Sequence, residues 1–509
     1  MVAGPLAPGV YVKERPSGVR TITGVGTSTP AFLGYTVGGP AASTPPTPIS
    51  SWSEFVDTFH FRSPLGAEQL AHELEGLPAA VEAATAELER LEADLKTKAT
   101  TGESPVLTVP EFDKLAEVQA ADWAGETVSA EDRKAAEEAA DKVSAALPDP
   151  YHQWIAAGEK VVALNRRRDE LLFLAAFFEE SEKCHLPEAV YGFFANGGSS
   201  CYVLRLDPTK PLASEVEGNP DQRTGLAGLK TVPDVTMVAV PDLWSRETPT
   251  QQGAEILGKV VGHCVTMRNR LALCEPPAGT AAVDVRSFLS KLASPDTDDA
   301  AFTALYYPWV DVPGVDGVPR TVPPSGHLAG VWARTDAERG VFKAPANQNL
   351  RGVLSLPVRL TDQRHGELND QGVNCLRLFP DRGLLVWGAR TRSSSRDWRY
   401  LNVRRLVSFL ADSIRQSSSW AVFEPNDDRL WAMLRHSVVS FLTDQWRQGA
   451  LLGRTPDEAF HVICDRTNNT PDTIDAGQVI CDIGVAPVRP AEFVQFTITQ
   501  IAGQPGATT

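Results

Sequence analysis

Apolar residues recur at alternating steps of four and three between residues 70 and 95, and this spacing constrains the possible folds of the chain more than any other feature. Such a seam predicts a helix that packs lengthwise on a partner helix. Pro78 lies inside the seam and predicts either a kink or the start of a new helix. The seam consists of Leu70, Leu74, Leu77, Val81, Ala84, Leu88, Leu91 and Leu95.

Residues 66–183 are therefore expected to form a helical insertion. A loop around 102–110 follows the seam, and further helices are expected over 129–146 and 151–182. The pattern favours an antiparallel hairpin or small bundle whose helices pack on each other. A separate binding role for this segment is the alternative.

The same segment carries most of the net charge. Residues 66–183 contain 26 acidic and 12 basic side chains, a net charge of −14, which leaves −2 for the remainder of a chain whose total is −16. This balance argues against a general nucleic-acid-binding protein, since such proteins present an excess of lysine and arginine.

Strands and helices are expected to alternate on both sides of the insertion, and this predicts an α/β (α+β) fold class with two domains. Residues 21–65 with 184–340 would form the middle domain, and 341–490 the C-terminal domain. The first has expected strands at 201–206, 235–240, 271–274 and 304–307, and expected helices at 186–195, 253–268 and 284–292. The second has an expected strand at 384–387 and amphipathic helices at 402–416 and 427–449.

Both ends of the chain read as extended arms, over 1–20 and 491–509. Prolines at 5, 8 and 16 disfavour a helix near the start, and glycine, proline and threonine dominate after residue 502. Alternating β-branched and aromatic residues give each arm strand character. The candidate strand residues are Val10, Tyr11, Val12, Phe493, Val494, Phe496 and Ile498.

The sequence offers no recognisable catalytic, cofactor or metal motif, so we expect neither an active site nor a bound cofactor. The seven cysteines include no CxxC pair, and the histidines are isolated, which is typical of buried thiols in a cytosolic chain. The first residues lack a basic start with an apolar core, and no run is long enough to cross a bilayer. We therefore expect neither a secretion signal nor direct insertion into a membrane.

Six arginines gather within sixteen residues and are opposed by Asp397 alone. Trp398 and Tyr400 leave a nucleic-acid-binding interpretation open, because aromatic rings stack on bases. A basic contact with an acidic protein surface is favoured, since arginine is enriched at protein interfaces. The candidate contact residues are Arg390, Arg392, Arg396, Arg399, Arg404 and Arg405.

Short motifs in a fixed order give the chain a resemblance to a known family. They begin with PGVYVKE at 8–14, include YYPW at 306–309 and end with IGVAPVRPAEF at 483–493. The chain resembles the contractile tail sheath proteins of phages and phage-tail-like injection systems over most of 1–65 and 186–505, but not over 66–183. Further motifs lie at 24–28, 31–34, 189–198, 322–327, 340–347, 368–369, 386–391 and 423–426.

The resemblance implies a structural protein that assembles with copies of itself. It implies stacked rings of six subunits around an inner tube protein, with baseplate and terminator or cap proteins at the ends. It also implies that the terminal arms add strands to the C-terminal sheet of neighbours, that the insertion faces outward, and that contraction drives the tube. The six arginines would contact neighbouring rings. Assembly is expected in the cytoplasm, in a particle that can later be released.

Two other interpretations compete with a sheath subunit. One is a different ring of the same machine, a terminator or baseplate component. The other is an α/β enzyme with a site that the sequence does not reveal. The sequence leaves open whether the machine is a phage, a released particle or an intracellular device.

Overall fold

The computed structural model describes residues 21–36, 38–59, 67–102, 104–181, 184–246 and 248–495. The chain divides into two compact units, one formed by residues 1–61 with 184–509 and the other by residues 62–183. The arm residues Val10, Tyr11, Val12, Phe496 and Ile498 lie outside the described residues.

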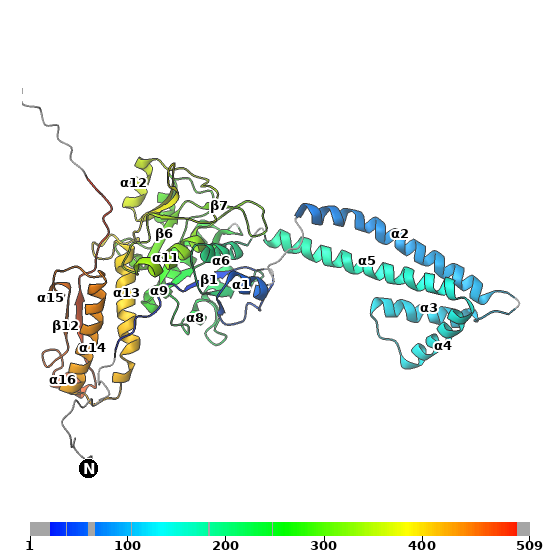
Figure 1. Ribbon diagram of the computed structural model, residues 1–509, viewed down its shortest axis with the longest axis horizontal. Coiled ribbons are helices and arrows are strands. Elements are labelled where there is room, and N and C mark those ends of the chain that lie inside the picture. Colours follow the sequence, from blue (N-terminus) through cyan, green and yellow to red (C-terminus); the bar gives the residue numbers. More distant parts are fainter. Residues whose placement is uncertain are drawn as a thin grey trace, which may run out of the picture. The chain divides into compact units, whose positions relative to one another are not determined.

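The smaller unit is built on two long helices that run side by side (Figure 1). These are α2 (Ala67–Thr100) and α5 (Pro148–Ser181), and they are joined through α3 (Val109–Ala124) and α4 (Ala130–Ala146). Leu95, Phe112, Leu115 and Trp154 are buried together in its core. The expected helical insertion is thus a bundle in which the leucine seam of α2 faces other helices.

The structure contradicts one of the two outcomes expected at Pro78, a new helix, and the extent of one loop. No new helix starts at Pro78, because α2 continues through it from Ala67 to Thr100. The expected loop at 102–110 is shorter than predicted, because α3 already begins at Val109. The Glu111 carboxylate accepts a hydrogen bond of 2.8 Å from the N–H of Thr108, the residue that caps α3. This threonine–glutamate spacing is a helix-start signal that the sequence contains.

The larger unit contains a mixed sheet of nine strands in the order β2-β3-β1-β4-β5-β6-β10-β11-β9. Neighbours from β3 to β10 are parallel, and β2, β11 and β9 add to its two ends in antiparallel pairs. The strands are β1 (Pro30–Gly34), β2 (Thr47–Ile49), β3 (Cys201–Arg205), β4 (Met237–Ala239), β5 (Leu271–Cys274), β6 (Thr303–Tyr307), β9 (Gln348–Asn349), β10 (Val373–Phe379) and β11 (Gly383–Trp387).

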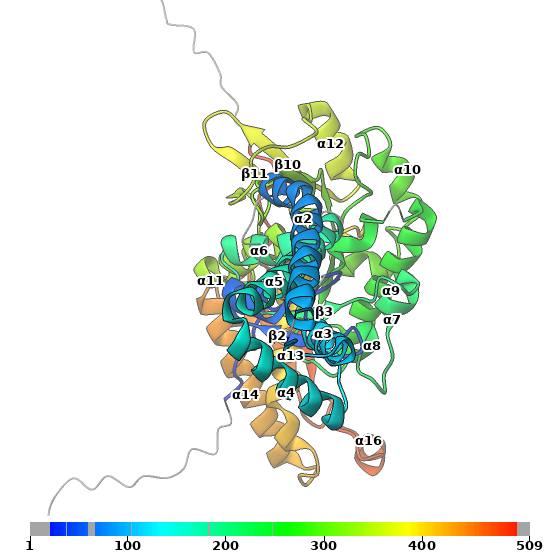
Figure 2. The ribbon, with the colours of Figure 1, turned by 90° about the vertical axis from the view of Figure 1, so that its right-hand side faces the viewer.

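Helices cover both faces of this sheet, with α9 and α10 on one side and α6 and α11 on the other (Figure 2). Successive strand residues enter opposite cores, as Leu33 and Phe32 do on β1. A largely parallel sheet buried on both faces confirms the α/β class. The covering helices are α1 (Trp52–Phe59), α6 (Leu186–Ala195), α7 (Leu212–Glu217), α8 (Gly225–Leu229), α9 (Thr250–Met267), α10 (Val285–Leu289) and α11 (Ser325–Arg339).

The sheet does not stop at the expected domain boundary between residues 340 and 341. Residues 373–375 of β10 pair in parallel with residues 305–307 of β6, so strands from both expected domains share one sheet. The boundary proposed from the sequence therefore does not correspond to a break in the fold. Short elements surround this region: β7 (Val310–Val312), β8 (Arg320–Val322) and α12 (Asp362–Asp370).

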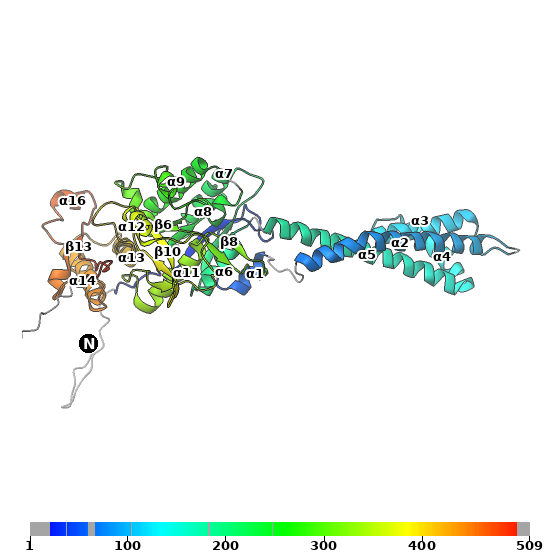
Figure 3. The same cartoon turned by 90° about the horizontal axis from the view of Figure 1, so that it is seen from above.

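A separate layer follows the large sheet along the chain. Helices α13 (Leu401–Ser417) and α14 (Asp428–Arg447) lie beside a two-stranded sheet of β12 (Phe460–Ile463) and β13 (Asp482–Val485), as Figures 1 and 3 show. The predicted helices at 402–416 and 427–449 are confirmed. Asp427 caps α14 by accepting hydrogen bonds from the N–H groups of Arg429 and Leu430. Two short helices complete the layer, α15 (Pro456–Ala459) and α16 (Pro471–Asp475).

Candidate assembly interface

The sheet formed by β12 and β13 contains only two strands within the described part of the chain. The strands are antiparallel, with Phe460 opposite Val485 and Ile463 opposite Asp482. A sheet of two strands leaves an unpaired backbone edge on each side, which is a template for further strands.

The hydrogen-bond alternation identifies which groups point to these edges. The N–H of Ala486 donates to the carbonyl of Ala459 at 2.9 Å, and this bond flanks the pair of Phe460 and Val485. In an antiparallel ladder, bonded and non-bonded pairs alternate. Val462 and Ile483 therefore form a non-bonded pair whose backbone groups point outward.

One face of this small sheet is anchored by apolar packing. Phe460 is buried, and Val462 and Val485 pack against the same cluster, which includes Leu442 of α14 and Leu406 of α13. On the opposite face the ring of His461 lies over Gly484, where an added Cβ would approach the ring to 2.0 Å. The sheet is thus fixed on one face by the helices, and no third strand of residues 21–495 is assigned to either edge.

An apolar hollow of about 580 Å³ adjoins the β13 edge. Phe423 stands at its rim with a fully exposed side chain and a φ of +67°, a backbone region that a phenylalanine rarely adopts. Val422 is exposed beside it. An apolar lining with exposed hydrophobic groups is typical of a protein contact. The lining includes Ile414, Leu430, Leu434, Val438, Val479 and Ile483.

The C-terminal segment leaves this layer in a defined direction. Glu492 accepts a hydrogen bond of 2.9 Å from Nε of Arg390, and both side chains are largely buried. The next two residues, Phe493 and Val494, are exposed by 80% and 71%. They line a second hollow of about 660 Å³ together with residues of α12 and β11. These two predicted arm residues thus lie exposed beside this hollow, directly after a fixed point.

The structure corrects the prediction that all six clustered arginines face a neighbour. Arg390, Arg392, Arg404 and Arg405 are each more than nine-tenths buried inside the chain. Arg404 lies over the rings of Trp398 and Phe302, which occupies its guanidinium within the fold. Arg396 remains exposed and Arg399 is half-buried. Only these two of the six are available as surface contacts.

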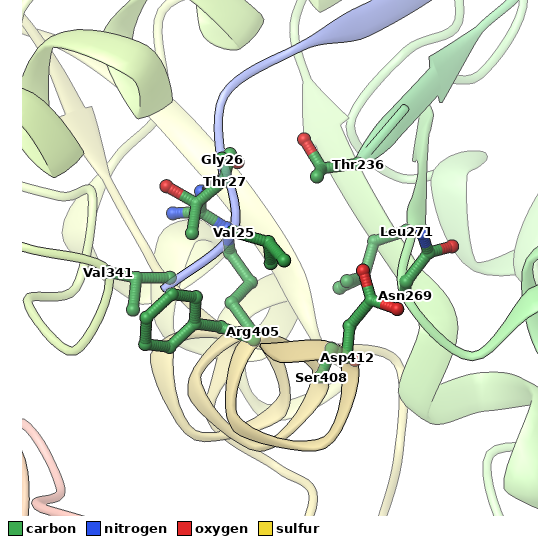
Figure 4. Close-up of a pocket in the computed structure, with 11 residues that line it drawn as sticks. Val25, Gly26, Thr27, Thr236, Asn269, Leu271, Val341, Arg405, Ser408 and Asp412 are labelled. Carbon is green, nitrogen blue, oxygen red and sulfur yellow. Dashed lines mark hydrogen bonds between the residues drawn. The ribbon is translucent and has the colours of Figure 1, made fainter. Parts of the chain in front are cut away.

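Arg405 joins three distant segments, and Figure 4 shows two of them, the one around Thr27 and α13. Its guanidinium pairs with Asp336 of α11 through an Nη1–Oδ1 bond of 2.9 Å and donates to the carbonyl of Thr27 at 3.1 Å. The Thr27 hydroxyl also donates to Asp336, at 2.6 Å. The chain that enters from the N-terminal arm is therefore tied to α13 before it reaches β1.

The fully buried carboxylate of Asp242 in the larger unit has structural partners. Asp242 accepts hydrogen bonds from the N–H groups of Tyr35, at 2.7 Å, and His185, while burial raises its pKa to about 7. In the described ranges, no group of three histidine, cysteine or acidic side chains could hold a metal ion. Nor does any helix there have the length and apolar character needed to span a membrane.

Strands β12 and β13 were not predicted, although the sequence of each carries a signal. Val462 and Ile463 follow the aromatic Phe460, and Ile483 and Val485 alternate in β13, as strand residues do. Their short length and the intervening residues 464–481 concealed the pairing. The apolar hollow had no local signal, because its lining comes from two separate stretches of the chain, 414–438 and 477–483.

Comparison with known families adds independent findings. Residues 218–392 match the central domain of the phage tail sheath protein, and residues 393–501 match the phage tail sheath C-terminal domain. The tail sheath protein of Enterobacteria phage T4 is 25% identical over 350 residues, which are 62% of this chain and 51% of the phage protein. The chain thus spans about half the length of this relative.

Solved structures are similar over nearly the whole chain. The contracted helical sheath of the anti-feeding prophage aligns with 97% of this chain and 99% of its own, with 26% identity and a TM-score of 0.58. The sheath complex of an extracellular contractile injection system, PVC, in its contracted state aligns with 98% of each chain, with 22% identity and a TM-score of 0.59. Because its identity is only 22%, the second similarity shows a shared fold and nothing more.

Proposed function

Because the chain belongs to the contractile tail sheath proteins, we propose that it builds a contractile sheath by exchanging terminal strands with copies of itself. Its general role is that of a structural sheath subunit. The observation that carries the finer proposal is the two-stranded sheet β12–β13 with outward-pointing backbone groups at Val462 and Ile483.

The two arms supply the strands that such edges accept. Val10, Tyr11 and Val12 lie in the N-terminal arm, and Phe493, Val494, Phe496 and Ile498 in the C-terminal arm. Strand addition pairs main-chain groups and inserts alternate side chains into neighbouring pockets. The apolar hollow beside Ile483 suits such side chains. Five bonds at about 1 kcal/mol each would give several kcal/mol per arm.

The anchored bases of the arms support exchange between subunits. The Arg405–Asp336–Thr27 contact holds the chain after the N-terminal arm, and the Arg390–Glu492 pair holds the chain before the C-terminal arm. Each arm therefore starts from a fixed point on its own subunit. A strand that pairs with a neighbour then keeps two subunits connected while they rotate.

The assembly we propose consists of stacked rings of six subunits around an inner tube, with baseplate and terminator proteins at its ends. Contraction would exchange one stable packing for another and would need no nucleotide hydrolysis by this chain. The acidic helical unit would face solvent, where its net charge of −14 least opposes assembly. Assembly in the cytoplasm precedes any release of the particle in this scheme.

The first experiment removes residues 1–15 and examines the purified protein by negative-stain microscopy. The expected result is a folded monomer, with unchanged circular dichroism, that forms no long tubes. Long tubes from the truncated chain would overturn strand exchange through the N-terminal arm. Single rings from the full chain would favour a terminator instead.

The second experiment blocks one sheet edge at a time. Proline at Val462 or at Ile483 removes an outward N–H and spares the inward bonds of the two flanking pairs. Each substitution is expected to stop tube growth with little change in the unfolding midpoint. The matched control is Ala42→Pro, at the first central position of the turn that the bond from Thr44 to Ala41 closes, outside both strands and the hollow. Normal tubes from both edge variants would contradict the proposal.

A further inference from the structure

Two cysteines stand at the same end of the β12–β13 sheet. Cys464 directly follows the last residue of β12, and Cys481 directly precedes the first residue of β13. Because Ile463 is opposite Asp482, the next position in the same register places Cys464 opposite Cys481. Residues 465–480 form the loop that connects the two cysteines, and this loop includes α16.

The alternation of hydrogen-bonded and non-bonded pairs also shows which kind of pair Cys464 and Cys481 form. The bond from Ala486 to Ala459 makes Phe460–Val485 and Val462–Ile483 non-bonded pairs. Cys464 and Cys481 occupy the next non-bonded position of the ladder. Opposite residues there have Cα atoms about 4.5 Å apart, and a disulfide needs a Cα separation of roughly 4.4–6.8 Å.

The surroundings of the two thiols keep them together. Both belong to the cluster around Leu430, Trp431 and Leu434 of α14. Cys464 is 1% exposed, whereas Cys481 is only half-buried and can be reached by a reagent. The two thiols share a hydrogen bond, which lowers the pKa of Cys464 and raises the pKa of Cys481.

We propose that Cys464 and Cys481 are an oxidisable pair, which forms a cross-strand disulfide when the folded protein meets a disulfide reagent such as oxidised glutathione. One cysteine loses its proton and attacks the reagent, forming a mixed disulfide and releasing one glutathione thiol. The second cysteine loses its proton and attacks the mixed disulfide, releasing the other glutathione thiol. Two protein S–H bonds and one reagent S–S bond are replaced by one protein S–S bond and two reagent thiols.

This disulfide would close the open end of the sheet. A reducing cytosol keeps such a pair as thiols, so the bond would form only after transfer to oxidising surroundings. The consequence for assembly rests on the proposed function: the staple would hold the acceptor strands in register while arms remain paired to them. It leaves the outward groups of Val462 and Ile483 free, so the oxidised subunit should still accept strands.

The chemical test uses the folded full chain with oxidised glutathione near pH 8, followed by alkylation of the remaining thiols and peptide mapping by mass spectrometry. The expected product has two fewer free thiols than the seven cysteines provide and a peptide that links Cys464 to Cys481. Cys481→Ser should abolish the link, whereas Cys375→Ser, which alters a cysteine buried in the large sheet, should retain it. Free or separately glutathionylated Cys464 and Cys481 would overturn the pair.

The same mapping on the chain lacking residues 1–15 separates this inference from the proposed function. A disulfide in that non-assembling chain supports the thiol pair whatever becomes of strand exchange. A second comparison tests assembly, with tubes grown from oxidised and from reduced full chains. Tubes are expected in both samples. Formation of the disulfide with loss of tubes in the oxidised sample alone would overturn the role as a staple.

Discussion

Arg390 and Glu492 form a largely buried ion pair between residues 102 positions apart, and the pair lies at the base of the C-terminal arm. Arg390 also donates from Nη1 to the carbonyl of Asn369 at 3.0 Å. The hydrogen bonds from Arg390 to Glu492 raise the pKa of Arg390, so the charge persists at any working pH. The pair therefore fixes the direction in which Phe493 and Val494 leave the fold.

Glu492→Gln should destabilise the larger unit and weaken assembly. It leaves the buried Arg390 guanidinium without its counter-charge, a loss of about 3 kcal/mol for a buried pair. Denaturant unfolding measures this change, and microscopy measures tube length. The control is Asp397→Asn, which breaks the exposed pair with Arg489 and should cost less than about 1 kcal/mol. Equal effects of the two substitutions would argue against a positioning role for Glu492.

Acid should destabilise the fold in part through His327. Burial lowers the pKa of His327 to about 4, below its usual value of 6.5. The folded state thus binds a proton less readily, and this stabilisation is present above pH 6.5 and is lost as the pH falls toward 4. A shift of this size corresponds to about 3 kcal/mol.

His327→Gln removes this contribution, so its unfolding free energy should vary less with pH between 6.5 and 4 than that of the parent. The comparison of slopes remains informative even where the variant is less stable throughout. His152→Gln, at an exposed position of the helical unit, is the control and should follow the parental curve. Parallel curves for His327→Gln and the parent would show that His327 is not the source of the pH dependence of the unfolding free energy.

Charge reversal at Arg396 should reduce assembly in a salt-dependent manner. Arg396 is the exposed member of the arginine cluster, so Arg396→Glu alters a surface contact without affecting buried packing. We expect shorter tubes at low salt and an unchanged unfolding midpoint, since surface charges act within a Debye length of about 10 Å at 0.1 M salt. Arg454→Glu, at another exposed position, serves as control. Normal assembly of the Arg396 variant would remove this residue from the contact.

The helical unit should be dispensable for folding of the larger unit. Its core of Leu95, Phe112, Leu115 and Trp154 comes entirely from residues 62–183. The elements that flank it in the chain, α1 and α6, touch directly, because the rings of Trp52 and Tyr191 lie 5.3 Å apart. Replacing residues 67–181 with a glycine–serine linker should preserve the unfolding midpoint and tube formation. Loss of folding would contradict the independence of the two units, and loss of tubes from a folded variant would give the helical unit a role in assembly.

Periodicity predicted the elements whose apolar faces are continuous in sequence. The leucine seam predicted α2, and Val403, Leu406 and Leu410 predicted α13. Pro78 left a kink or a new helix open, and of these the new helix is excluded, because α2 continues through Pro78. The one-sheet arrangement could not be predicted, since the pairing of β6 with β10 joins segments about seventy residues apart.

The candidate interface was predictable only in part. The arms were predicted because proline and glycine flank short apolar runs, and they stay a prediction, since the structure describes only Phe493 and Val494 of the seven arm residues. The arginine cluster was misinterpreted because sequence reveals charge density but not burial. Asp336 and Glu492, which pair with Arg405 and Arg390, lie 69 and 102 residues away. Because these acidic partners are distant in sequence, arginines that resemble a surface patch in the sequence are paired inside the fold.

The continuity of the large sheet determines where motion can occur. Parallel hydrogen bonds between β6 and β10 span the point where two domains were expected, and breaking such a ladder would expose several unsatisfied backbone groups. No hinge can therefore open there at moderate cost. In the proposed sheath, a change in tube length would then be absorbed outside this sheet, and the sheet would transmit force as a rigid body.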